Sequence, residues 1–270
     1  MLPVLATVGG APIRTHDACV ALGIAVAGWV FHREVRYWRE RGRAADERLW
    51  AVVAGALAGG AVLAKLGTWA QHLDPRDNAS LAEQWLYGNR SILSGLVGAY
   101  LGALVAKRLI GYREHTGDLF APAVALGMAV GRVGCLLSEL PGTPTTLPWA
   151  VTLTPREAVA IPGAVPGVGL HPSFAYEILF HLAAFLALRL LRDRLDAPGE
   201  LFKLYLAGYA VFRFAVELVR GNEVAALGLT RPQLFLLACL PLLAWHLVRQ
   251  WRLGTYAQVL RPASQEVVRP

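Results

Sequence analysis

Long apolar runs recur along the chain and are separated by shorter polar segments. A helix needs about 20 residues to cross the hydrocarbon layer of a membrane. With this length as a ruler, the pattern predicts seven membrane-spanning helices, near residues 16–32, 49–70, 91–111, 118–138, 172–192, 200–220 and 232–249. The sequence shows no strand pattern between them. We therefore expect an all-α integral membrane protein that forms a single polytopic membrane domain over residues 1–270.

Basic residues are distributed unevenly between alternate connecting segments. Arg and Lys cluster between the first and second spans, after the third and fifth spans, and in the tail, but are scarcer in segments 71–90, 139–171 and 221–231. Because Lys and Arg concentrate in cytoplasmic loops, we expect the N-terminus outside and residues 250–270 as a cytoplasmic tail. Segment 139–171 is then an outward-facing loop region, whose many prolines prevent one continuous helix.

Composition supports the membrane assignment and narrows the possible partners. The 270 residues are 55% hydrophobic and 17% charged, whereas soluble domains are about 25% charged. The formal charge of +7 does not indicate nucleic acid, because the basic residues lie beside apolar runs, where they suit anionic lipid headgroups. Cys19, Cys135 and Cys239 have unrelated spacings, so we predict no disulfide framework, no metal site and no cofactor.

Small residues recur at close-packing intervals in two of the predicted spans, over residues 55–60 and 94–102. Such spacing lets the backbones of membrane helices approach one another. We expect helix packing here, and the alternative is a groove for lipid or substrate.

Three charges interrupt the sixth predicted span. Arg213, Glu217 and Arg220 follow Tyr209 at helical intervals and share one face. Each charge at the centre of a bilayer costs about 3 kcal/mol, so such residues usually face a bundle interior or a wet cavity and carry function. Arg132 lies at the outer end of the fourth predicted span, and its alternative interpretation is an interfacial arginine that reaches toward water.

Several motifs occur in a characteristic order. They are Gly131-Arg-Val-Gly134, Glu139-Leu-Pro-Gly142, His171-Pro-Ser-Phe-Ala-Tyr-Glu177, Gly208-Tyr-Ala-Val-Phe-Arg-Phe-Ala-Val-Glu-Leu-Val-Arg220 and Leu229-Thr-Arg-Pro-Gln233. Together they resemble the bacterial prolipoprotein diacylglyceryl transferases over most of the chain. The resemblance implies transfer of a diacylglyceryl group from phosphatidylglycerol, or another anionic phospholipid, to the lipobox cysteine of a preprolipoprotein. It also implies a multi-pass protein of the bacterial cytoplasmic membrane.

The resemblance assigns roles to the motif residues. Arginine presents a forked set of donors that suits a phosphate leaving group, and Glu217 is expected to orient Arg213 and Arg220. The residues expected to act in catalysis are Arg132, Glu139, Arg213, Glu217, His16 and His171. Those expected to bind substrate are Arg132, Gly142, Tyr209, Arg213 and Arg220.

The chain departs from the family pattern at three positions. Leu93 replaces the family's histidine, Cys135 its asparagine and His16 an early tyrosine. Leucine has no proton chemistry, so we hypothesise that His16 or His171 accepts the proton instead. The alternatives are that His16 is an ordinary interfacial histidine and that His171 caps or packs a helix.

Two further side chains allow two interpretations each. Cys135 is either a small buried residue or a nucleophile, and Glu177 makes either a structural hydrogen bond or a catalytic contact. The other histidines are expected at the surface or in packing: His32, His72, His115, His181 and His246. The functional alternatives to the transferase are a noncatalytic phospholipid-binding or transport protein and a transferase for another acceptor.

Overall fold

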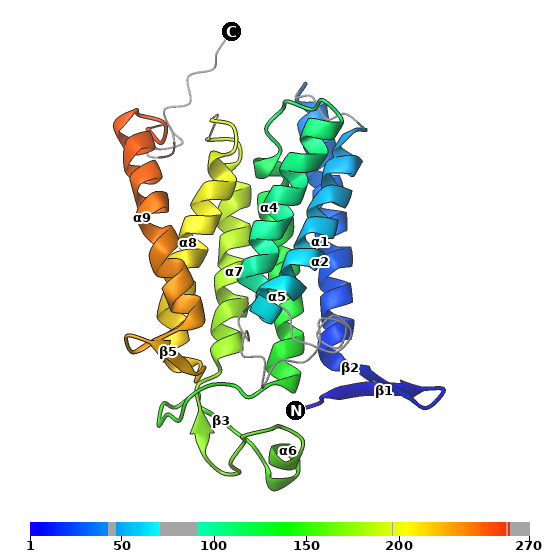
Figure 1. Cartoon of the computed structure of the whole chain (residues 1–270), viewed down its shortest axis with the longest axis vertical. Helices are drawn as coiled ribbons and strands as arrows, with labels where there is room; N and C mark the ends of the chain where they lie inside the picture. The colour runs from blue at the N-terminus through cyan, green and yellow to red at the C-terminus, as the bar shows by residue number, and fades with distance from the viewer. Residues whose placement is uncertain (43–46, 71–90, 196, 258, 260–270) are drawn as a thin grey trace. The chain divides into compact units, whose positions relative to one another are not determined.

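The computed structural model describes residues 1–42, 47–70, 91–195, 197–257 and 259, and Figure 1 draws their helices and strands. Helices dominate these residues. They are α1 (Thr15–Glu40), α2 (Leu49–Ala70), α4 (Ile92–Leu109), α5 (Gly117–Ser138), α6 (Pro155–Val159), α7 (Ser173–Leu191), α8 (Glu200–Val216), the 3-10 helix η1 (Glu217–Val219) and α9 (Arg231–Arg252).

Six of the described helices, α1, α2, α4, α5, α7 and α9, are long and apolar enough to cross a membrane. The prediction of a mainly helical membrane protein is confirmed. The sixth predicted span, 200–220, is shorter than expected, because α8 has 17 residues before the chain tightens into η1. The orientation of the spans and the single-domain division stay predictions, and most of the predicted tail lies outside the described residues.

The described residues also contain three short antiparallel strand pairs that the sequence analysis does not predict. They are β1 (Val4–Val8) with β2 (Ala11–Arg14), β3 (Val151–Thr152) with β4 (Gly169–Leu170), and β5 (Val224–Ala226) with β6 (Leu229–Thr230). The first turns through Gly9 and Gly10, whose φ angles of 57° and 83° favour glycine. These strands are too short to show a hydrophobic alternation. The prediction of an all-α chain without strands was therefore wrong at these short segments.

The chain divides into two compact units, one formed by Met1–Val35 with His115–Pro270 and the other by Arg36–Glu114. In the second unit, α2 packs on α4 through glycines. A Cβ added at Gly55 would lie 2.7 Å from the Gly102 carbonyl oxygen, and one at Gly59 would lie 2.9 Å from Gly102 Cα. The predicted close packing of the small residues is confirmed.

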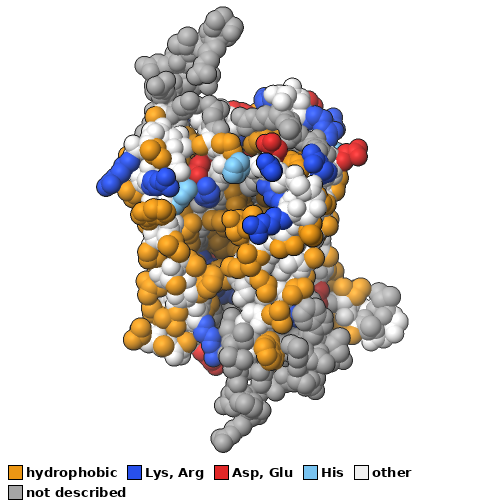
Figure 2. Space-filling view, turned by 45° about the horizontal axis from the view of Figure 1, so that its top comes forward, with side chains coloured by type: hydrophobic (Ala, Val, Ile, Leu, Met, Phe, Trp, Pro, Cys, Tyr) orange, Lys and Arg blue, Asp and Glu red, His pale blue; other side chains and the backbone are white. Residues whose placement is uncertain are grey.

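The first unit contains the start of α1 together with α5, α7, α8 and α9. Half of the apolar stretch of α5 is buried, the largest share among the six described spans. Glycines let α1 approach α5, since a Cβ at Gly23 would lie 2.7 Å from the Gly127 carbonyl oxygen and one at Gly134 would lie 3.0 Å from His16 Cα. This approach brings the start of α1 to the C-terminal end of α5. Hydrophobic side chains cover much of the visible surface in Figure 2.

Segment 139–171 folds on a small apolar cluster of its own, formed by Leu153, Ile161 and Leu170. As predicted, no continuous helix forms there. The short helix α6 begins with a capping box in which Thr154 and Glu157 bond reciprocally. The amino group of Met1 also contacts Glu157, and this hydrogen bond, with those from Thr154, lowers the pKa of the carboxyl to about 2.

Candidate functional site

Glu177 lies at the centre of a buried ion network. Its side chain is fully buried in the second turn of α7. Arg132 Nη2 lies 2.6 Å from Glu177 Oε2, and Arg220 Nη1 donates to Glu177 Oε1 at 2.5 Å. Because Arg132 belongs to α5 and Arg220 follows η1, one carboxylate joins three segments that are distant in the sequence.

A second buried pair closes the C-terminal end of α8. Arg213 donates to Glu217 Oε2 one helical turn later, as the spacing predicts. The other oxygen, Glu217 Oε1, accepts from Asn222 Nδ2 at 2.6 Å and from Thr230 Oγ1 at 2.9 Å. Thr230 is also the N-cap of α9. The Glu217 carboxylate therefore fixes the Arg213 guanidinium and ties the end of α8 to the start of α9.

Glu139 extends the network toward the surface. It is the residue at which α5 ends, and its side chain is 41% exposed. Glu139 Oε2 lies 4.0 Å from Arg220 Nη2, and Glu139 Oε1 lies 3.7 Å from His16 Nε2. The structure thus brings His16 and Glu139 to the edge of the arginine network, as the hypothesis for His16 requires.

Gly142 and His171 lie beside this network, where the backbone of the 139–171 loop passes close to the end of η1. A Cβ at Gly142 would come within 2.7 Å of the His171 carbonyl oxygen and 2.5 Å of the Val219 carbonyl oxygen, so only glycine fits. The His171 ring contacts Tyr176, whose hydroxyl lies 3.3 Å from Nδ1. The contacts found for His171 therefore belong to the loop and the start of α7, whereas those of His16 reach the carboxylates.

His181 is a buried residue that the sequence analysis placed among surface or packing histidines. It is fully buried on α7, one turn after Glu177. The Tyr205 hydroxyl lies 3.1 Å from His181 Nδ1, and the Tyr209 ring centroid lies 4.9 Å from that of His181. Of the two predicted settings, surface or packing, the structure shows packing. The signal that identifies it is its spacing of four residues from Glu177 on one helix face.

Several buried polar atoms of the network have no hydrogen-bond partner among the described residues. They are the Nε atoms of Arg132 and Arg220, the Nε2 atom of His181, the hydroxyl of Tyr209 and Oε2 of Glu177, which is in ion-pair contact with Arg132. Buried polar groups in proteins are nearly always paired. The two arginine Nε–H groups among them can only donate, and they suit a group that brings acceptor oxygens.

Three possible metal-binding side chains also meet at the edge of the network. A nitrogen of His16, the sulfur of Cys135 and a carboxylate oxygen of Glu139 all lie within 4.8 Å of one another. Cys135 is 5% exposed, and Arg132 Nη1 lies 3.8 Å from its sulfur. The residues come from the start of α1, the last turn of α5 and the position after it.

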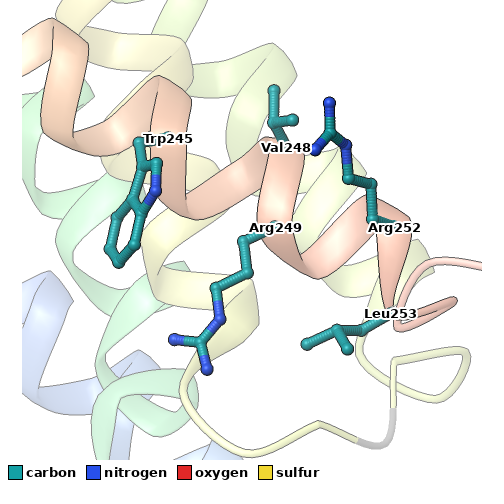
Figure 3. Close-up of a pocket in the computed structure, with 5 residues that line it drawn as sticks. All are labelled: Trp245, Val248, Arg249, Arg252 and Leu253. Carbon is teal, nitrogen blue, oxygen red and sulfur yellow. The ribbon is translucent and has the colours of Figure 1, made fainter.

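The C-terminal end of α9 carries a surface pocket, shown in Figure 3. Its lining residues are Trp245, Val248, Arg249, Arg252 and Leu253. The guanidinium of Arg249 lies 5.8 Å from the Trp245 ring centroid. Aromatic and basic side chains at a helix end are typical of membrane interfaces, and this pocket shares no residue with the ion network.

The apolar helices and the buried arginine–carboxylate network define a multi-pass membrane protein with charge in its helical core. The family model described as "Prolipoprotein diacylglyceryl transferase" matches residues 3–249. The chain therefore belongs to the prolipoprotein diacylglyceryl transferase family, a family of membrane transferases, as the sequence motifs predict.

Two relatives illustrate the extent of the similarity. A protein of Nocardia farcinica is 34% identical over 233 residues, which cover 80% of this chain and 46% of the relative. One of Dehalococcoides mccartyi is 31% identical over 264 residues, covering 92% of this chain and 95% of the relative. Both are named phosphatidylglycerol–prolipoprotein diacylglyceryl transferase. The chain spans about half the length of the first relative and nearly all of the second.

Proposed function

We propose that this protein transfers the diacylglyceryl group of phosphatidylglycerol to the thiol of a lipobox cysteine in a preprolipoprotein, at the outer side of a bacterial cytoplasmic membrane. The observation that carries the proposal is the buried cluster of Arg132, Arg213 and Arg220, held by two carboxylates in a chain of this family. The chemistry forms a carbon–sulfur bond at the glyceryl carbon and breaks its carbon–oxygen bond to phosphate. Glycerol phosphate leaves.

The arginines suit the charge that develops on the departing phosphate. Arg132 and Arg220 share the single carboxylate of Glu177, so this trio keeps a net positive charge and unpaired donors. Guanidinium groups bind phosphate oxygens in paired fashion. In a water-poor site, fixed donors of this kind stabilise a leaving anion far more than they do in water. Arg132 and Arg220 are accordingly assigned to the phosphate.

Arg213 and Tyr209 extend this binding site along α8. Glu217 holds Arg213 through one oxygen and uses the other for Asn222 and Thr230, which fixes the guanidinium without a flexible partner. The Tyr209 hydroxyl is buried and has no hydrogen-bond partner among the described residues. We assign it to an oxygen of the lipid. Gly142 supports the site by letting the loop backbone pass close to η1.

A transfer assay with purified protein tests the proposal. Protein in lipid nanodiscs is incubated with phosphatidylglycerol and a synthetic lipobox peptide, and mass spectrometry measures the diacylglyceryl-modified peptide. We expect Arg213→Ala to lower the rate by at least about 100-fold, because losing one fixed donor to a developing anion has an effect of this size. Arg156→Ala is the matched control, since Arg156 is exposed on α6 and takes part in none of the network's ion pairs.

Changing the lipid or the acceptor peptide in this assay distinguishes the proposed transferase from its alternatives. Phosphatidylcholine in place of phosphatidylglycerol, and a peptide with serine in place of the lipobox cysteine, should give no product. Leu93 in α4 lacks the proton-accepting group that the resemblance places there, which is the observation that favours a noncatalytic lipid-binding protein. Binding of phosphatidylglycerol with no modified peptide would support that alternative and contradict the transferase.

A further inference from the structure

His16, Cys135 and Glu139 offer the donor atoms of a zinc site. Zinc is bound by imidazole nitrogen, thiolate and carboxylate at about 2.0 to 2.3 Å in tetrahedral geometry, which places neighbouring donors about 3.3 to 3.8 Å apart. The separation of His16 Nε2 and Glu139 Oε1 is already 3.7 Å, and all three donors lie within 4.8 Å of one another.

The surroundings of His16 match those of metal-binding histidines. Such a histidine usually gives its second ring nitrogen to a carboxylate, which fixes the ring and its tautomer. Here Asp17 Oδ1 lies 3.4 Å from His16 Nδ1, while Nε2 faces Glu139. The inner ligand Cys135 is buried, and the side chains of His16 and Glu139 are 37% and 41% exposed. An ion therefore has an open approach from the surface.

The charges near the cluster include carboxylates as well as arginines. Arg132 is paired with Glu177, and Arg220 lies between Glu177 and Glu139. Asp17 Oδ1 and Glu139 Oε1 face the two nitrogens of the His16 ring, at 3.4 and 3.7 Å. An ion that binds Cys135 displaces its thiol proton, because cysteine binds zinc as the thiolate.

We propose that His16, Cys135 and Glu139 bind one Zn²⁺ ion, whose fourth position takes the acceptor thiol of the peptide. Three protein ligands with an open position are the arrangement of catalytic zinc sites. The acceptor thiol releases its proton to water on binding, because a coordinating thiol is deprotonated. Its sulfur electron pair then forms the bond to the glyceryl carbon, while the carbon–oxygen pair leaves with the phosphate. This role rests on the proposed transfer, but the binding of the metal does not.

Cobalt titration of the chelator-treated protein tests the metal site without any transfer assay. Co²⁺ replaces zinc in tetrahedral sites and gives charge-transfer absorption when a thiolate binds it. We expect this absorption to saturate at a single equivalent in the wild-type protein and in Cys239→Ser, and to be lost in Cys135→Ser. Cys239 is the matched control because it lies on α9 and is not part of the cluster. Asp17→Asn should weaken Co²⁺ binding about tenfold by removing the outer carboxylate.

The acceptor role has its own readout. A lipobox peptide with its cysteine should intensify the charge-transfer absorption of the Co²⁺ protein, and the same peptide with serine should leave it unchanged. Equal Co²⁺ absorption in Cys135→Ser and wild type, or none in wild type, would overturn the metal site. Identical spectra with the two peptides would overturn thiol coordination. Co²⁺ binding together with a failed transfer assay would uphold the metal site while contradicting the proposed function.

Discussion

The two ends of α8 each bury a carboxylate among donors, but they differ in how the donors are satisfied. At the start, Glu200 accepts from Lys203 Nζ at 2.7 Å, lies 3.0 Å from His246 Nε2, and accepts from the Tyr256 hydroxyl at 2.9 Å. One acid there meets three partners. Near the other end, Glu177 of α7 is shared by Arg132 and Arg220.

This difference separates a structural network from one equipped to bind an anion. The Lys203 and His246 side chains are 41% and 23% exposed, so solvent can reach both. The Arg132 and Arg220 side chains are 5% and 13% exposed and keep unpaired Nε atoms. Because leaving buried donors unpaired costs free energy, an excess of them is not expected from packing alone. The comparison predicts that changes at the start of α8 affect stability, while changes near its end affect transfer as well.

Glu177→Gln should have the largest effect. The amide removes the negative charge that Arg132 and Arg220 share, and breaking a buried pair by removing one partner costs about 3 to 5 kcal/mol. We expect a lower thermal midpoint and almost no transfer in the remaining folded protein. Thermal unfolding in nanodiscs and the peptide assay measure the two effects. A variant with wild-type transfer would show that the shared carboxylate is dispensable.

Glu200→Gln should have an intermediate effect that is confined to stability. The amide is a poorer acceptor for Lys203 and His246, and losing buried hydrogen bonds to a charged group costs about 1.5 to 3 kcal/mol. We expect a lower thermal midpoint and an unchanged transfer rate per folded molecule. Active protein is counted from the folded fraction in the same preparation. If Glu200→Gln lowers the transfer rate by more than it lowers the folded fraction, the Glu200 network is not purely structural. It would then no longer differ from the Glu177 network in this respect.

The sequence predicts the fold of this molecule better than the contacts of its site. The apolar runs locate the helices because a membrane span needs a fixed length of apolar residues. The Arg213–Glu217 pair is also predictable, since its members are four residues apart on one helix. Local spacing likewise placed Arg220 near Glu217, yet the structure pairs Arg220 with Glu177. That contact depends on the packing of α7 against the end of α8, which no local pattern contains.

Local sequence patterns also fail to predict the cluster of His16, Cys135 and Glu139, because it forms through tertiary packing. Sequence signatures of metal sites depend on short intervals between ligands, whereas here one ligand starts α1 and the others end α5. Only the glycine-mediated approach of these two helices brings them together. His181 was assigned to the surface or to packing for a related reason, because a lone histidine in an apolar run shows its importance only through the neighbours that tertiary packing supplies.

Two tyrosine variants, one in each network, should have the smallest effects and compare the two networks most directly. Tyr256→Phe removes a hydroxyl that donates to Glu200, and Tyr205→Phe removes the one beside His181 Nδ1. Both changes delete one buried hydrogen bond, so each should lower stability by about 1 kcal/mol. Only Tyr205→Phe should also lower the transfer rate, because it frees the His181 ring beside Tyr209 and Arg132. Equal rates in the two variants would mean that the His181 side of the network serves packing alone, as Glu200 does.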